Sequence, residues 1–201
     1  INAIGIREGD SLLEAKLTDG NCDIMIAANS GKAIRFPEAK VRAMGRGASG
    51  VRGISIDTSK NFVVGMICVN NFDSNVLVVS ENGYGKRSDI DSYRITNRGG
   101  KGVKTISITT KTGNLIAIKN VIDSDGLMII NKSGVMIRMN VEAMRVMGRA
   151  TQGVKLINLK ESDQISSVAK VEIDESDETD SVVSDNEFTD DKENWYLSPH
   201  N

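Results

Sequence analysis

Apolar residues along this chain gather in short runs that alternate with clusters of Gly, Asn, Asp and Ser. Runs of roughly four to eight residues that are rich in Val and Ile and bounded by turn formers are typical of β-strands. In the first part of the chain such runs lie at residues 24–28, 33–36, 51–56 and 62–69. The pattern therefore predicts four strands there.

The same arrangement occurs twice more. Predicted strands follow at residues 76–79, 84–86, 103–108 and 115–121, and then at 127–130, 135–139, 154–159 and 165–171. Gly31, Gly83 and Gly134 stand between the first two strands of each set, where a tight hairpin needs a residue that tolerates positive φ. Helical segments are at most a turn or two, at residues 38–44 and 142–147.

The spacing of basic and glycine residues indicates that the three sets are copies of one repeat. The pattern Arg98, Gly102, Val103, Lys104 recurs 52 residues upstream and 51 residues downstream, as Arg46, Gly50, Val51, Arg52 and as Arg149, Gly153, Val154, Lys155. A fixed period of this length indicates a repeat architecture, in which each small sheet needs neighbours to bury its faces. We expect an all-β, propeller-like fold: a partial ring of about three four-stranded antiparallel blades.

The copies also set the predicted boundaries. We expect blades at residues 21–72, 73–122 and 123–171, preceded by the end of another blade at 1–20 and followed by an acidic tail at 172–201. The segment 1–20 is assigned in this way because Ile6, Asp10 and Leu12 align with Leu159, Asp163 and Ile165. High charge and few apolar residues predict a disordered tail, although its one apolar cluster, residues 195–197, could instead dock on the body.

The net charge of -2 hides a division between body and tail. Residues 1–171 contain 24 Lys and Arg against 16 Asp and Glu, a net charge of +8, whereas residues 172–201 contain one Lys against 11 acids, a net charge of -10. A basic body suggests a polyanionic partner, and an acidic tail could compete for the same surface.

Basic residues recur at one position per repeat, which favours a basic stripe along one edge of the assembled blades. Mixed charges would serve solubility as well, so a stripe of one sign indicates nucleic-acid binding. Aromatic residues are scarce, which is against a platform that stacks single-stranded bases, and we expect binding of duplex phosphates with bending and without sequence specificity. The candidate DNA-binding residues are Arg35, Arg42, Arg46, Arg52, Arg87, Arg94, Arg98, Lys101, Lys104, Arg138, Arg145, Arg149 and Lys155.

Other classes of site find little support. Cys22 and Cys68 have no metal-binding spacing and are expected to be buried free thiols, and the single histidine, His200, is next to last. The Gly-x-Gly-x-x-Gly pattern at residues 45–50 precedes a strand-like run where a dinucleotide site needs a helix. No run of about 18 apolar residues occurs, so we expect a soluble, cytoplasmic protein. Because the cysteines, the histidine and the glycines form no pattern suited to a site, we expect no cofactor, metal or catalytic residues in this chain.

Several segments together resemble the C-terminal domain of the DNA gyrase A protein: G-K-A-I-R-F-P-E, M-G-R-G-A-S-G-V-R-G-I, E-N-G-Y-G-K-R, R-G-G-K-G-V-K and G-R-A-T-Q-G-V-K-L-I-N-L. The resemblance covers residues 1–171. It implies a β-pinwheel, in which neighbouring blades exchange strands, and wrapping of duplex DNA around a basic edge. It also implies membership of an ATP-dependent type II topoisomerase of bacteria that introduces negative supercoils. The partners would be the rest of gyrase A and, in the whole enzyme, gyrase B, with the catalytic tyrosine outside this chain.

The family usually has six blades, and this chain resembles the last three together with the end of the one before. It departs from the family pattern in one respect. The family's Q-R-R-G-G-K-G box belongs to the first blade, whereas N-R-G-G-K-G at residues 97–102, one blade from the end, resembles the fifth-blade relative of that box. The resemblance further implies that the acidic tail restrains wrapping. Two alternatives stay open: the corresponding C-terminal domain of topoisomerase IV and a kelch-like protein-interaction propeller, which would need a Tyr and Trp pattern that this chain lacks.

Overall fold

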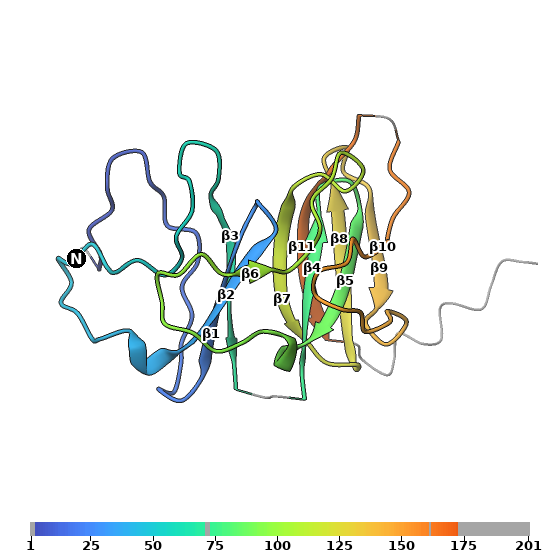
Figure 1. The fold of residues 1–201 in the computed structure, drawn as a ribbon. Helices are drawn as coiled ribbons and strands as arrows, with labels where there is room; N and C mark the ends of the chain where they lie inside the picture. The colour runs from blue at the N-terminus through green and yellow to red at the C-terminus, as the bar shows by residue number, and fades with distance from the viewer. Residues whose placement is uncertain (1–2, 71–72, 161, 173–201) are drawn as a thin grey trace, which may run out of the picture.

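The computed structural model describes residues 3–70, 73–160 and 162–172, and the fold in this part of the chain is all-β (Figure 1). Two single-turn 3₁₀ helices lie in the same described ranges, η1 (Glu38–Lys40) and η2 (Ile90–Ser92). The strands are β1 (Asp23–Ala28), β2 (Lys32–Pro37), β3 (Val63–Val69), β4 (Asn75–Ser80), β5 (Tyr84–Asp89), β6 (Val103–Lys104), β7 (Leu115–Val121), β8 (Asp125–Asn131), β9 (Met136–Asn140), β10 (Val154–Lys155) and β11 (Ile165–Glu172).

Across the described residues the strands form three antiparallel sheets, and two of these sheets take a strand from the following repeat. The orders are β3-β1-β2-β6, β10-β5-β4-β7 and β11-β8-β9. Val103 of β6 pairs with Ala33 of β2, and Val154 of β10 pairs with Gly85 of β5. Figure 1 shows the chain leaving the second sheet after η2, crossing to the first sheet and returning. The propeller-like antiparallel fold is confirmed, although no sheet of the described chain draws four strands from one repeat.

The alternation of side chains along the strands explains how the sheets stack. On β4, Val76 and Val78 face a core shared with the first sheet, whereas Leu77 and Val79 face a core shared with the third. A strand buried on both faces needs apolar residues at consecutive positions, and β4 has them from Val76 to Val79. Strand β7 packs against both β3 and β11, so the three sheets converge on the edge formed by these strands.

The predicted hairpin turns are present. Gly31, Gly83 and Gly134 have φ of 75°, 79° and 86°. Because glycine lacks a Cβ, it adopts this left-handed region without the steric cost that other residues meet. Each turn leads the first strand of a sheet into the second.

The predicted strands in the glycine-rich part of each repeat were too long. Residues 103–108 and 154–159 pair over two residues only, and residues 51–56 form no strand. A strand needs a partner edge, and β6 and β10 pair briefly before the chain turns inward, where Ile106 is buried. The helical prediction at 38–44 is reduced to η1, the one at 142–147 is wrong, and η2 was not predicted.

Two further expectations concern membranes and the tail. None of the helices in the described ranges is long and apolar enough to cross a membrane. The predicted disordered tail lies, apart from Glu172 at the end of β11, outside the described residues.

Candidate nucleic-acid interface

Three equivalent segments carry most of the predicted basic residues, and we call them straps. Strap 1 comprises residues 42–52, strap 2 residues 94–104 and strap 3 residues 145–155. Strap 2 ends in β6, the outermost strand of the first sheet, and strap 3 ends in β10, the outermost strand of the second. Straps 2 and 3 therefore lie on the edges of the first two sheets that are opposite β3 and β7.

A glycine before the paired residues lets each of these two straps approach its acceptor sheet. A Cβ on Gly102 would lie 2.6 Å from the carbonyl oxygen of Ala33, and one on Gly153 would lie 2.5 Å from that of Gly85. Both glycines also have positive φ, 70° and 80°. Close backbone approach and left-handed conformation together explain why a glycine stands at this position of the repeat.

Successive straps lie side by side, since hydrogen bonds join each to the one before. The amide of Ser55, just after strap 1, donates to the carbonyl oxygen of Gly100 in strap 2, over 2.9 Å. The amide of Ser107, just after strap 2, donates to the carbonyl oxygen of Thr151 in strap 3, over 3.0 Å. The three straps thus form a continuous layer across neighbouring repeats.

Two predicted DNA-binding residues also hold this layer together. Arg98 donates to the carbonyl oxygens of Lys40 and Arg52, at 3.1 and 3.2 Å. Arg149 donates to those of Ser92 and Lys104, at 3.0 and 2.9 Å. Both side chains are half-buried. Their first role in this structure is to fasten one repeat to the next.

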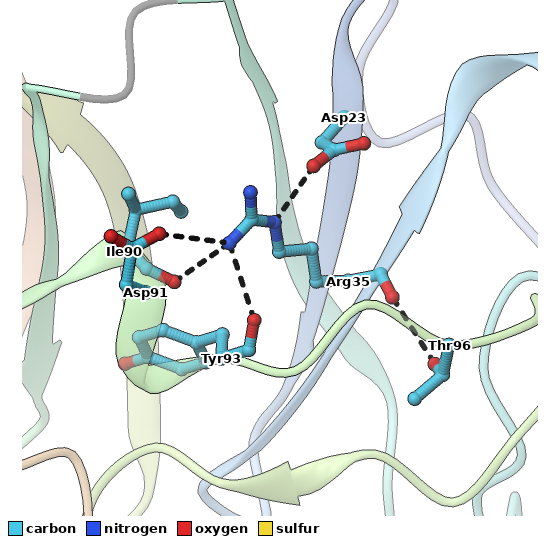
Figure 2. Close-up of polar contacts among 6 residues, drawn as sticks. All are labelled: Asp23, Arg35, Ile90, Asp91, Tyr93 and Thr96. Carbon is cyan, nitrogen blue, oxygen red and sulfur yellow. Dashed lines mark hydrogen bonds and ion pairs between the residues drawn. The ribbon is translucent and has the colours of Figure 1, made fainter.

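The prediction that Arg35 contacts DNA is at odds with the structure, because its side chain is buried. Figure 2 shows its guanidinium pointing toward Asp23, Ile90 and Tyr93. Its Nε donates to Asp23 over 2.8 Å, and its Nη1 donates to the carbonyl oxygens of Ile90 and Tyr93 in the next repeat. The backbone oxygen of Arg35 accepts in turn from Thr96 at the start of strap 2. A guanidinium removed from water needs such acceptors, and here it joins two sheets.

Arg87 has the equivalent place in the second sheet, and its side chain is also buried. It donates to the carbonyl oxygen of Met144 and to the side chains of Asn75 and Asp123. Arg138, the third member of the series, is exposed, and it donates to the carbonyl oxygen of Glu172. A polar residue twelve positions earlier, Asp23 for Arg35 and Asn75 for Arg87, was the available sequence signal for a structural arginine.

The other predicted residues are exposed, and all of them lie on the straps. None forms an ion pair with another of the described residues. Beneath strap 2 a pocket of about 300 Å³ is lined by Arg94, Thr96, Asn97 and Lys101, among others. The exposed strap cations are Arg42, Arg46, Arg52, Arg94, Lys101, Lys104, Arg145 and Lys155.

A buried lysine under strap 3 was missed by the sequence argument. Lys86 is aligned with Ile34 and Ile137 in the other repeats, its side chain is fully buried, and its Nζ donates to the carbonyl oxygen of Gly148. Burial, with a smaller contribution from the charge of Arg149, lowers its pKa from 10.5 to about 8. The repeat alignment shows where Lys86 departs from its counterparts, and this departure was the available signal.

The cysteines are free thiols with no catalytic setting. Cys22 is buried and Cys68 is half-buried, so the expectation of burial holds fully for the first. Burial and a hydrogen bond to Glu38 raise the pKa of Cys22 to about 12, which keeps the thiol protonated and unreactive. The described residues contain no group of three or more His, Cys, Asp and Glu side chains that could hold a metal ion.

Comparison with protein families gives one match that covers most of the chain. The family model described as "DNA gyrase C-terminal domain, beta-propeller" matches residues 23–70, 74–121 and 127–172. Each matched segment contains one hairpin and one of the convergent strands β3, β7 and β11.

Curated relatives and solved structures point the same way. The DNA gyrase A protein of Staphylococcus aureus strain NCTC 8325 is 45% identical over 177 residues, which are 88% of this chain and 20% of the relative. The same protein of strain MRSA252 is 44% identical over 176 residues. The chain thus spans about a fifth of the length of these relatives.

Two solved structures show the same fold at lower identity. A C-terminal domain of DNA topoisomerase IV gives a TM-score of 0.80 at 22% identity, covering 85% of this chain and 53% of that one. A DNA gyrase A C-terminal domain gives a TM-score of 0.76 at 24% identity, covering 84% of this chain and 57% of that one.

Proposed function

Since this chain belongs to the family of DNA gyrase C-terminal domains and is homologous to the C-terminal part of a type II topoisomerase protein, we propose that its straps bind and bend duplex DNA. One observation carries the proposal. Eight exposed cations lie on three hydrogen-bonded straps, and within the described ranges none has an acidic partner.

The geometry of the straps suits phosphates better than bases. Their cations lie on successive repeats along one edge, so a duplex that follows this edge meets a cation at each repeat. Neutralising phosphates releases condensed counterions, which favours binding regardless of base sequence. If the edge is curved, as in a propeller, the duplex must bend to keep its contacts, and wrapping follows.

In the whole enzyme we assign this part of the chain a binding role without catalysis. Other regions of gyrase A would catalyse strand cleavage, and gyrase B would hydrolyse ATP. This part of the chain would bind the same DNA as those regions. Among the described residues near the straps, the titratable groups with a shifted pKa are Lys86 and Tyr93. Both are buried, and neither lies in a cluster suited to strand cleavage.

The test is a salt titration of duplex binding by the full chain. We expect log affinity to fall linearly with log salt, with a slope of about -0.9 for each phosphate contact, and to be the same for AT-rich and GC-rich duplexes. Replacing Arg94 and Lys101 of strap 2 by alanine should reduce the slope by about 2, whereas Lys119→Ala on β7, at the opposite edge of the second sheet, should leave it unchanged.

Two results would contradict the proposal. One is an absence of duplex binding by the unaltered chain at low salt. The other is an equal loss from the strap variant and the β7 control, because affinity would then follow net charge and not the straps. Bending is measured separately, from energy transfer between dyes at the two ends of a bound duplex.

A further inference from the structure

We propose that Lys111, Lys155 and Lys160 form a second phosphate subsite for DNA, around Tyr84 at the outer edge of the second sheet. The inference rests on the proposed function and extends the contact surface beyond the straps. Of these residues only Lys155 belongs to the recurring cations of the repeat. The other two lysines lie in the segments that precede β7 and β11.

A pocket is present at this place. It has a volume of about 350 Å³, and its lining includes Tyr84 and the three lysines, which are exposed. None of the lysines forms an ion pair with a described residue. Asp163 also lines the pocket, but its carboxylate accepts hydrogen bonds from Ser133 and Asn131, and the bond from Ser133 lowers its pKa.

One of the lysines is held in place before any ligand arrives. The Nζ of Lys111 lies 5.4 Å from the centre of the Tyr84 ring, a cation–π contact. The loop that carries Lys111 is tied down as well, because the side-chain amide of Asn82 donates to the carbonyl oxygens of Thr110 and Lys111. A positioned cation loses less conformational entropy on binding an anion than a freely moving one does.

The first sheet has two cations at the equivalent place. Lys104 of β6 lies directly opposite Lys32 of β2. In the second sheet Lys155 is the counterpart of Lys104. It lies opposite Tyr84, and Tyr84 is the counterpart of Lys32. Lys111, placed over the Tyr84 ring, supplies the second cation there. Both sheets thus present a pair of cations where the strap strand meets the hairpin.

Like charges directly opposite on neighbouring strands destabilise a sheet unless something neutralises them. A phosphate between the two cations would do so. The pairs recur on successive sheets along one edge, which favours a ligand that is itself repetitive, namely the DNA backbone, over a single small anion. Lys104 and Lys155 also belong to straps 2 and 3, so the subsites are continuous with the proposed interface.

The experiment measures duplex affinity against salt for Lys111→Ala, Lys160→Ala and the double variant, all in the full chain. We expect the log–log slope to fall by about 1 for each lysine removed. Lys111→Arg keeps the charge and should keep the slope. Lys119→Ala removes a charge from β7, at the opposite edge of the second sheet, and serves as the control.

Each outcome has one meaning. If the unaltered chain binds no duplex, the proposed function fails and the subsite fails with it. If the chain binds but the alanine variants keep its slope, the subsite alone is wrong. If the variants bind DNA more tightly, the pocket holds the acidic segment of this chain and not a phosphate, which also overturns the inference.

A measurement on the unaltered chain avoids any effect of substitution on folding. Lysines are acetylated with a small reagent, with and without duplex, and the modified positions are read by mass spectrometry. Protection of Lys111 and Lys160 with no protection of Lys119 supports the subsite. Equal modification with and without DNA contradicts it.

Discussion

At the scale of single residues, the aligned basic positions of the repeat divide by burial. Arg35 and Arg87 fasten one sheet to the next from inside, Arg98 and Arg149 fasten the straps at half-buried positions, and the remaining strap cations face solvent. A buried guanidinium is tolerated because backbone carbonyls of the next repeat meet its donors. The equal spacing of these cations does not separate them, and contacts with the next repeat decide which of them are buried.

Lys86→Ile should stabilise the domain at neutral pH, because isoleucine occupies the aligned positions 34 and 137. The depressed pKa of Lys86 means that the unfolded chain binds its proton more tightly than the folded chain does. At about 1.4 kcal/mol per pKa unit, burying the charge costs about 3 kcal/mol at pH 7. Loss of the bond to Gly148 offsets about 1 kcal/mol, so we expect a net gain of about 2 kcal/mol.

The pH dependence gives the sharper check. Stability of the unaltered chain should rise from pH 8 towards pH 10.5, the interval between the folded and the unfolded pKa, and Lys86→Ile should remove that rise. Urea unfolding at several pH values measures it, with Lys119→Ile as a control that retains Lys86. The same pH slope in the Lys86 variant would contradict the assignment.

At the scale of elements, the straps behave differently from the strands that their sequence predicts. The alternating residues 103–108 are typical of one strand, yet the backbone pairs with β2 over two residues and then turns so that Ile106 enters the core between the first and second sheets. Strap 1 has the same sequence pattern but forms no strand. Pairing depends on an available sheet edge, which local sequence does not specify.

Gly102→Ala should therefore separate strap 2 from β2, whereas Gly50→Ala in strap 1 should leave the contacts of the straps unchanged. Both glycines have positive φ, 70° and 82°, so both substitutions carry a similar backbone cost. A Cβ on Gly102 meets the carbonyl oxygen of Ala33 at 2.6 Å, but one on Gly50 has no neighbour within 4 Å. We expect Gly102→Ala to cost about 1–3 kcal/mol more in free energy of unfolding.

Urea unfolding of both variants measures this difference, and duplex binding shows whether a detached strap loses DNA. Equal destabilisation by the two substitutions would mean that close packing of the strap contributes nothing to stability.

At the scale of the whole molecule, the three sheets of the described chain converge on β3, β7 and β11, and straps 2 and 3 pair with the opposite edges of the first two sheets. The net charge changes sign at the end of β11. Residues 1–172 contain 24 Lys and Arg against 17 Asp and Glu, a net charge of +7, and residues 173–201 contain one Lys against ten acids, a net charge of -9. An acidic segment attached to a basic body has a high effective concentration near it, so we expect this segment to compete with DNA.

A chain that ends at Glu172 should for this reason bind duplex DNA more tightly than the full chain at low salt. The difference should shrink as salt increases, because the Debye length falls to about 8 Å near 0.15 M and screens exposed charges. Binding titrations of the two chains at several salt concentrations measure it. Equal affinity at low salt would show that residues 173–201 do not compete for the DNA surface.

The repeat, its period, the hairpins at Gly31, Gly83 and Gly134 and the basic character of the body could all be predicted from the sequence, because each depends on residue type at a local spacing. The exchange of β6 and β10 between sheets was expected only from family resemblance. The roles of Arg35, Arg87 and Lys86, and the grouping of Lys111 and Lys160 with Lys155, came from the folded structure. These depend on which segments from different repeats meet, and so on burial and acceptor geometry that no single stretch of sequence contains.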